Sequence, residues 1–300
     1  MLARRRLLVA LLVSLGFLSA CGGAPVAPVV ETPAGTVIPP PPVLPKVALA
    51  LGGGAARGFA HVGVVKMLES QGLKVDLIIG TSAGSVVGAL YASGLNGFQL
   101  QEMTFDLERA AFADWQLFNR GLLRGEKLQN FVNDKVGGRK IQQLPRRFAA
   151  VAAKLRTGEA MVFTSGDVGL AVRASSAIPG VFQPAVIDNE EYVDGGTVSP
   201  VPVRFARELG AEVVIAVDVS APVEEAREDS TLGTVLKAFD IMGSSLRRAE
   251  LPSADVVIAP DVHGIKAADF DSKQRAILAG ERAALAAMPA IRAAIAAKTR

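Results

Sequence analysis

The chain has 300 residues, of which 50% are hydrophobic and 5% aromatic, and its formal net charge at pH 7 is +3. This length and composition predict a globular protein with one large core or two smaller ones. Three positive charges belong to Arg4, Arg5 and Arg6, so the rest of the chain has as many basic as acidic residues, 29 of each. Because no basic cluster is interleaved with aromatic residues, the sequence gives no support for a nucleic-acid partner.

Residues 1–20 have the pattern of a secretory signal. The three arginines precede an apolar stretch, 7–18, and small residues then lead to Cys21, the only cysteine in the chain. The apolar stretch is too short for a membrane span, and the positive region before it is typical of a signal peptide. A lone cysteine has no internal disulfide partner. Its position after Leu-Ser-Ala resembles the lipobox of bacterial lipoproteins, which predicts lipid attachment at Cys21; the alternative is an ordinary signal with a chance cysteine.

The segment from Gly22 to Pro45 contains eight of the 17 prolines and shows no hydrophobic periodicity. This composition predicts an extended tether. We therefore expect a signal peptide at 1–20, the lipidated cysteine and tether at 21–45, and one globular domain at 46–300. Glycines follow the cysteine directly, where an aspartate is linked to inner-membrane retention, so the expected location is the bacterial outer membrane.

Strand-like and helix-like segments alternate within the domain. The expected elements are strand 47–51, helix 58–70, strand 75–79, helix 83–93 and, later, two continuous β-branched strands at 212–220 and 255–260. This order predicts an α/β fold with parallel strands and crossover helices. The more polar segment 97–145 is expected to be a helical insertion, with aromatic residues at 112, 115, 118 and 131 and basic residues at 120, 124 and 127. It is either a groove or lid for an acyl chain or an ordinary packed layer.

A single serine is presented between the second strand and the following helix. Ser82 lies in the sequence Gly80-Thr-Ser-Ala-Gly84. In such a strand–turn–helix corner the glycines permit the tight backbone and the hydroxyl projects beyond the sheet. The next N–H, that of Ala83, begins a helix and is suited to binding an anion. The pattern predicts a nucleophile at Ser82.

A serine nucleophile needs a base, and the sequence offers three candidates. His61 follows the glycine loop on the first expected helix and is interpreted as a packed or capping histidine. His263 follows the last strand, where an α/β-hydrolase would place its histidine, but such enzymes have several strands before the nucleophile. Asp194 ends a short hydrophobic segment and is followed by Gly195 and Gly196; taken alone, this pattern is typical of a turn.

The loop LGGGAARG, residues 51–58, joins the first strand to the first helix. A dinucleotide-binding loop requires a third glycine where Arg57 stands, and an acidic residue at the end of the second strand, whereas Asp76 lies at its beginning. Consecutive glycines instead allow backbone N–H groups to converge on an anion. We expect an oxyanion hole here, with Arg57 adding positive charge.

These motifs, in this order, resemble the patatin-like phospholipase family. The resemblance is carried by ALALGGGAARGFAHVGVVKMLE, DLIIGTSAGSVVGALYASG, LLRGEKL, AVRASSAIPGVFQPAVID, EYVDGGTVSPVPVRFARELGA and VVIAVDVS. It implies a three-layer α/β/α fold with a mainly parallel central sheet, and a Ser-Asp dyad without histidine. By position, it implies the nucleophile Ser82, the base Asp194 with Gly195 and Gly196, the elbow glycines Gly80 and Gly84, and an oxyanion loop with Gly53, Gly54, Arg57 and Gly58.

One position departs from the plant members of this family, because Ala55 stands where they have a third glycine. The neighbouring serines Ser175 and Ser176 precede a Pro-Gly turn and are interpreted as scaffold. The resemblance implies no metal and no cofactor. The expected function is hydrolysis of lipid acyl esters beside a membrane; the alternatives are a catalytically silent lipid-binding or scaffolding lipoprotein, and acyl transfer to an acceptor other than water.

Overall fold

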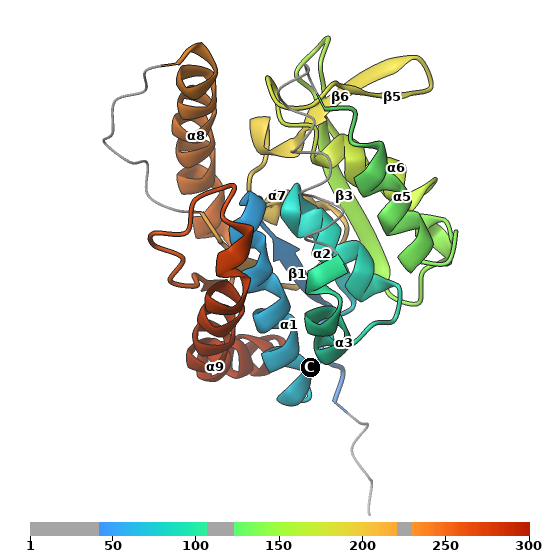
Figure 1. Ribbon diagram of the computed structural model, residues 1–300. Coiled ribbons are helices and arrows are strands. Elements are labelled where there is room, and N and C mark those ends of the chain that lie inside the picture. The colour runs from blue at the N-terminus through green and yellow to red at the C-terminus, as the bar shows by residue number, and fades with distance from the viewer. Residues whose placement is uncertain (1–41, 107–122, 221–229) are drawn as a thin grey trace, which may run out of the picture. The chain divides into compact units, whose positions relative to one another are not determined.

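The computed structural model describes residues 42–106, 123–220 and 230–300. Within them, Pro42–Arg300 forms one compact unit built on an eight-stranded mixed sheet (Figure 1). The expectations for the signal, Cys21 and the tether up to residue 41 lie outside the described residues. The same holds for the aromatic and basic residues at 112, 115, 118 and 120.

The strands of this part of the chain are β1 Val47–Leu51, β2 Leu77–Thr81, β3 Arg147–Lys154, β4 Ala160–Phe163, β5 Ala185–Ile187, β6 Glu190–Asp194, β7 Val213–Val217 and β8 Val256–Ile258. The helices are α1 Phe59–Ser70, α2 Ala83–Ala92, α3 Gly97–Glu102, α5 Glu126–Lys135, α6 Val168–Ser175, α7 Val203–Glu208, α8 Thr231–Glu250 and α9 Lys273–Lys298. Two short 3₁₀ turns, Ala55–Gly58 and Gly195–Thr197, follow β1 and β6.

The strand order is β5-β6-β3-β2-β1-β7-β8, with β4 paired to β3. Within the run β3-β2-β1-β7-β8, every strand is parallel to its neighbours. Strands β4 and β6 run antiparallel to β3. The expected α/β fold with crossover helices is therefore confirmed, and the sheet is mixed because β4 and β6 pair antiparallel with β3, and β5 pairs antiparallel with β6. Carboxyl ends of parallel strands share one edge, which is where open α/β folds bind ligands.

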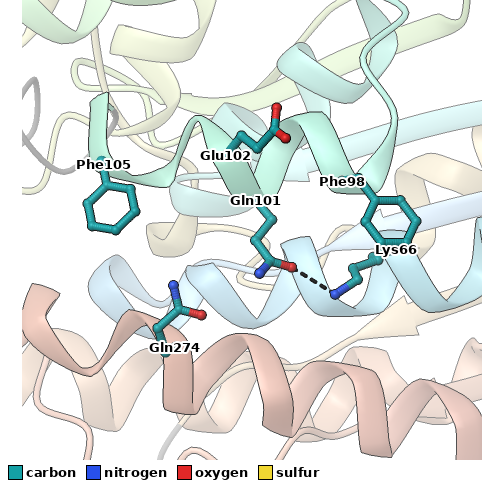
Figure 2. Close-up of a pocket in the computed structure, with 6 residues that line it drawn as sticks. All are labelled: Lys66, Phe98, Gln101, Glu102, Phe105 and Gln274. Carbon is teal, nitrogen blue, oxygen red and sulfur yellow. Dashed lines mark hydrogen bonds between the residues drawn. The ribbon is translucent and has the colours of Figure 1, made fainter.

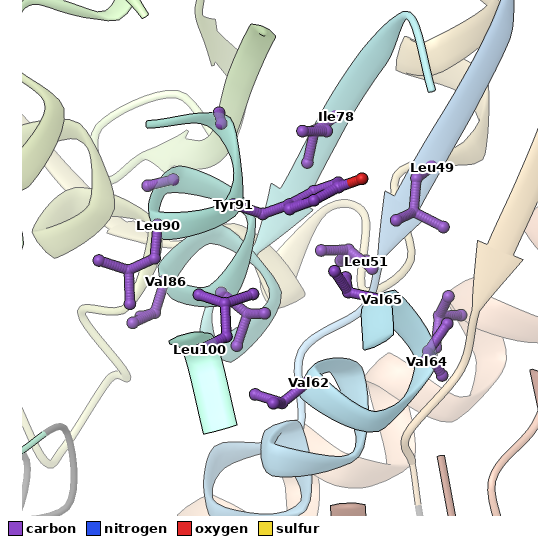
Figure 3. Close-up of a cluster of buried hydrophobic side chains, with 14 of the residues drawn as sticks. Leu49, Leu51, Val62, Val64, Val65, Ile78, Val86, Leu90, Tyr91 and Leu100 are labelled. Atoms are coloured by element: carbon purple, nitrogen blue, oxygen red, sulfur yellow. The ribbon is translucent and has the colours of Figure 1, made fainter. Parts of the chain in front are cut away.

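Two apolar clusters cover the two faces of the sheet, as expected for strands that are apolar throughout. Alternate residues of a strand point to opposite faces: Leu49 and Ile78 belong to the cluster that includes α1, α2, α6 and α9, and Ala50 and Ile79 to the cluster that includes α7. Figure 3 shows part of the larger cluster, where side chains from β1 and β2 meet those of α1 and α2. The result is helix layers on both faces, the larger with α1 and the smaller with α7 (Figure 1).

Strand β2 lies two residues later than the expected 75–79. Asp76 precedes the first paired residue of β2, Leu77. Its carboxylate accepts from the Val47 N–H at 2.7 Å, and its own N–H donates to the Val47 carbonyl at 2.8 Å. It thus fixes the start of β1. The strand then continues through Gly80 and Thr81, so it delivers the chain directly to Ser82.

Helices α1 and α9 touch backbone to backbone through two glycines. A Cβ on Gly63 would lie 1.9 Å from the Ile277 carbonyl oxygen, and one on Gly280 would lie 2.0 Å from the Ala60 carbonyl oxygen. We expect Gly280→Ala to lower the free energy of unfolding by about 3 kcal/mol, since the helices would have to separate. Urea unfolding monitored by circular dichroism measures this.

The matched control is Gly243→Ala in α8, where a Cβ would lie 3.8 Å from Pro200 Cγ, an ordinary contact. Alanine is favoured over glycine inside a helix by about 1 kcal/mol. The same substitution should therefore stabilise the protein at position 243. Equal effects at the two positions would contradict the close packing of α1 on α9.

Candidate active site

The turn between β2 and α2 presents Ser82 in a strained backbone conformation. Ser82 has φ 52° and ψ −124°, a region that a non-glycine residue adopts only when its surroundings impose it. The turn is tight: a Cβ on Gly80 would lie 2.4 Å from the Gly84 carbonyl oxygen, and one on Gly84 would lie 2.1 Å from the Leu51 carbonyl oxygen. Both glycines are therefore required for close approach, and they fix the serine at the carboxyl edge of the sheet.

Strand pairing brings Asp194 to the same edge. Thr81, the last residue of β2, pairs with Val151 of β3, and Asp194, the last residue of β6, pairs with the next residue, Ala152. Gly195 then passes so close over the end of β3 that a Cβ would lie 2.2 Å from the Val151 carbonyl oxygen and 3.2 Å from Thr81 Cγ2. The chain after Asp194 thus crosses toward the strand that carries Ser82.

The Asp194 carboxyl is buried, with 2% of the residue exposed. Its Oδ1 accepts from the Gly196 N–H at 2.7 Å. Its Oδ2 is buried, and no described group donates to it with normal hydrogen-bond geometry. Burial raises the pKa of Asp194 to about 6, although the Ser82 hydroxyl and the Gly196 N–H oppose this by stabilising the carboxylate. Asp194 therefore has a carboxylate oxygen for which Ser82 is the available partner, and a pKa suited to accepting a proton near neutrality.

The glycine loop after β1 packs against this turn. A Cβ on Gly53 would lie 3.3 Å from Ser82 Cβ, and one on Gly58 would lie 2.5 Å from Ala83 Cβ. The Gly53 N–H donates to the Pro200 carbonyl at 2.9 Å, so it is already used. The Gly54 and Ala83 N–H groups donate to no acceptor in the described part of the chain, so both are available to an anion.

Two further residues of the loop have defined conformations. Arg57 directs both its backbone N–H and its Nε toward the Gly54 carbonyl, at 3.1 and 3.2 Å. Ala55 adopts φ 49°, the left-handed region that favours glycine. The position where alanine replaces the expected glycine is therefore the strained one, and the strain is accommodated in the 3₁₀ turn that orients Arg57.

Neither histidine is placed as a base for Ser82. His61 is fully buried; burial lowers its pKa to about 4, and its Nε2, which carries the proton in this neutral form, lies 2.7 Å from the Gly52 carbonyl oxygen. It is a packed histidine that holds the glycine loop. The His263 side chain is 73% exposed, and its Nδ1 contacts Asp261 at 2.6 Å.

Ser175, the last residue of α6, ties the Ser82 turn to the neighbouring strand β3. Its Oγ accepts from the Ser82 N–H at 2.9 Å and donates to the Val151 carbonyl at 2.6 Å. This explains why a serine stands there and gives the scaffold interpretation a definite form. The sequence shows only two adjacent serines, and which one faces Ser82 depends on the packing of α6.

We expect Ser175→Ala to lower the free energy of unfolding by about 2 kcal/mol, because two buried backbone groups lose their partner. The kcat of any reaction that uses Ser82 should fall about tenfold or more, since the Ser82 turn is no longer held. Urea unfolding and steady-state kinetics on the same preparation measure both. Ser176→Ala is the control: the Ser176 Oγ is buried with no partner among the described residues, so its loss should leave stability and kcat nearly unchanged.

Helix α8 lies beside the turn that follows Asp194. A Cβ on Gly196 would lie 3.0 Å from Phe239 Cζ, and one on Gly180 would lie 3.2 Å from Leu232 Cδ1. Arg247 Nε pairs with Asp218 Oδ2 at 3.3 Å, which ties the helix to the end of β7. This helix was not among the elements expected from the sequence, although the amphipathic pattern over 231–250 was the available signal.

A separate surface pocket of about 390 Å³ lies between α1, α3 and α9 and contains no residue of the dyad or the glycine loop. Figure 2 shows it lined by polar side chains and by the rings of Phe98 and Phe105, with Lys66 donating to Gln101 at 2.8 Å. In the described ranges no group of three His, Cys, Asp or Glu side chains is placed to hold a metal ion. The same ranges contain no helix both long and apolar enough to span a bilayer.

Comparison with curated proteins finds relatives in bacteria and mammals. An uncharacterized NTE family protein of Mycobacterium tuberculosis is 39% identical over 182 residues, 59% of this chain and 49% of the relative. A second one from that organism is 30% identical over 269 residues, 81% of this chain and 46% of the relative. Mouse patatin-like phospholipase domain-containing protein 6 is 31% identical over 230 residues, 73% of this chain and 16% of that protein. The chain thus spans half or less of the length of these relatives.

Among solved structures, the ExoU–SpcU complex of Pseudomonas aeruginosa matches with a TM-score of 0.49 at 16% identity, covering 86% of this chain and 53% of that one. VipD of Legionella pneumophila matches with a TM-score of 0.44 at 13% identity, covering 86% and 68%. The family model of the patatin-like phospholipases matches residues 49–207, which include the glycine loop, the serine turn and the Asp-Gly-Gly turn. The chain belongs to the patatin-like phospholipase family.

Proposed function

We propose that this chain is a lipid acyl hydrolase in which Ser82 is the nucleophile and Asp194 the base. The observation that carries the proposal is the pairing of Ser82, on a strained turn, with the buried carboxyl of Asp194. The Oδ2 of this carboxyl makes no hydrogen bond of normal geometry with any described group, and its pKa is raised to about 6. Membership of the patatin-like phospholipase family and the name of the mouse relative support the choice of a lipid ester as substrate.

In the first step, Asp194 Oδ2 accepts the Ser82 hydroxyl proton while the serine oxygen attacks the ester carbonyl carbon. Negative charge develops on the carbonyl oxygen, and the N–H groups of Gly54 and Ala83 are the donors available to it. Collapse of the tetrahedral intermediate breaks the bond to the alcohol, which leaves with the proton from Asp194. The product is an acyl-enzyme at Ser82.

In the second step, Asp194 accepts a proton from water, and the resulting hydroxide oxygen attacks the acyl carbon. Release of the fatty acid returns the proton to Ser82. An alcohol in place of this water would give acyl transfer. The alternative function, lipid binding without catalysis, would need neither the strained turn at Ser82 nor the buried carboxyl of Asp194.

The test is hydrolysis of short and long p-nitrophenyl acyl esters and of phosphatidylcholine vesicles by residues 42–300, the compact unit. We expect release of p-nitrophenol and fatty acid. Adding a competing alcohol and analysing products separates hydrolysis from transfer. An inert domain toward all of these substrates would favour the silent lipid-binding function.

We also propose that the full chain is anchored to the bacterial envelope through a lipid on Cys21, with residues 21–45 as a tether to the outer membrane. The support is the signal pattern and the position of the only cysteine. Mass spectrometry of the N-terminal peptide from membranes should show a diacylglyceryl cysteine. Cys21→Ser should release the chain from the outer-membrane fraction; retention there would contradict the anchor.

A further inference from the structure

We propose that the outer face of α8 docks on the surface of a lipid bilayer and brings the dyad to it. This inference rests on the proposed function, because it supposes that the substrate lies in a membrane. The starting observation is that α8, Thr231–Glu250, runs for 20 residues without a single buried residue. An amphipathic helix in a globular domain normally buries its apolar face, so the exposed apolar residues of this one need a partner.

The inner face of α8 lies directly against the candidate site. Phe239 packs over Gly196, two residues after the proposed base, and Leu232 packs over Gly180. Arg247 and Asp218 form a mostly buried ion pair, with side chains 16% and 14% exposed. Anything that covers the outer face of α8 is therefore separated from the candidate site by this one helix.

The outer face of α8 carries an apolar stripe. Val235, Ile241 and Met242 are 44%, 50% and 57% exposed. They lie on one side of the helix with Ala238 and Ser245, which are also exposed, because residues three and four apart share a face. The same spacing places Lys237, four residues before Ile241, and the exposed Arg248, three residues after Ser245, at one border of this stripe. Large exposed apolar side chains gathered in this way mark a binding surface.

A second exposed apolar pair lies on the opposite side of the site. Val186 of β5 pairs with Glu191, whose carbonyl accepts from the Leu155 N–H, so the three residues form one row across the sheet. Val186 and Leu155 are 56% and 49% exposed. Figure 1 shows α8 and the β5–β6 hairpin rising at the same end of the domain. Asp194, at the end of β6, lies between them along the chain path to Gly196.

The position of the two apolar surfaces favours a bilayer as occupant. A second protein that covered both the α8 stripe and the row of Val186 and Leu155 would also cover the approach to Ser82. A bilayer that covers both would supply the ester from the same side. The side chains are of the size that amphipathic helices insert at an interface, where affinity grows with the apolar area buried.

The experiment measures flotation of residues 42–300 with vesicles of phosphatidylcholine and phosphatidylglycerol. This unit contains the whole described sheet and both apolar clusters, and it lacks Cys21, so no attached lipid contributes. The variant combines Val235→Ser, Ile241→Ser and Met242→Ser. The control combines Leu278→Ser and Leu285→Ser on α9, where the side chains are equally exposed, at 48% and 52%.

We expect the α8 variant to bind vesicles at least about tenfold more weakly, since burial of one such side chain is worth that factor. Its hydrolysis of vesicle lipid should fall in proportion, while its kcat/KM on p-nitrophenyl butyrate stays at the wild-type value and the α9 control matches wild type throughout. The unchanged butyrate activity also shows that the variant is folded.

Three outcomes would overturn the docking proposal: a wild-type domain that does not bind vesicles, an α8 variant that binds them as wild type does, or equal losses in the α8 and α9 variants. A change from dimer to monomer in the α8 variant, with vesicle binding kept, would identify a second copy as the occupant instead. Wild-type binding that depends on α8, with no hydrolysis of either ester, would support the docking surface and contradict the proposed function.

Discussion

Ser82→Ala should lower the esterase kcat/KM by at least about 10³-fold while the domain stays folded. Removing a nucleophile leaves only what substrate binding and the oxyanion donors contribute. Alanine lacks the hydroxyl yet keeps the backbone at φ 52°, so the strain of the turn remains and the free energy of unfolding should change little. Initial rates on p-nitrophenyl butyrate and urea unfolding check the two parts of this result.

Ser82→Gly makes the matched comparison, because glycine adopts positive φ without strain. It should lose activity as completely as the alanine variant and raise the free energy of unfolding by about 1 kcal/mol relative to it. A glycine variant no more stable than alanine would contradict the strain at this turn. Residual activity above 10% of wild type in either variant would remove Ser82 from the mechanism.

The parts of the fold that follow from local sequence were predicted well. Strand β1, helix α1 and helix α2 lie within one or two residues of the expected ranges, because continuous apolar strands and glycine turns are local signals. The two-residue shift of β2 has a nonlocal cause. Asp76 pairs with Val47, 29 residues earlier in the chain, and no property of the segment 75–79 reveals this partner.

The antiparallel edge of the sheet was not predictable in the same way. Asp194 alone has the pattern of a plain turn, and only the register of β6 on β3 brings it toward Ser82. Likewise, whether Gly53 or Gly54 can donate to an anion depends on the Pro200 carbonyl, which accepts from the Gly53 N–H. Pairings between distant segments decide these details, and one sequence carries no direct record of them.

Asp194→Asn should lower kcat/KM by about 10²–10⁴-fold, since an amide cannot accept the Ser82 proton. In the wild type, kcat/KM should rise about tenfold per pH unit up to pH 6 and level off above it, because the pKa of Asp194 is about 6 and only the carboxylate is a base. Stopped-time assays from pH 4.5 to 8 give the profile. A wild-type rate independent of pH in this range would exclude Asp194 as the titrating base.

The same substitution should stabilise the fold above pH 6. Asp194 has a pKa of 3.8 when unfolded and about 6 when folded, so between these values the native state binds more protons and stability falls as pH rises. His61 acts in the opposite sense: its pKa falls from 6.5 to about 4 on folding, so stability falls as pH drops through that range. The two slopes oppose each other in the wild type.

Subtracting the wild-type curve from that of Asp194→Asn isolates the carboxyl, because His61 is present in both proteins. The difference in the free energy of unfolding should be small at pH 4, grow toward pH 6 and reach a plateau of at most about 3 kcal/mol. With the aspartate removed, stability should instead rise with pH between about 4 and 6.5, the signature of the buried neutral histidine. A difference that does not depend on pH would mean that the Asp194 carboxyl is not raised in pKa by its burial. The same desolvation would then no longer account for its suitability as a base.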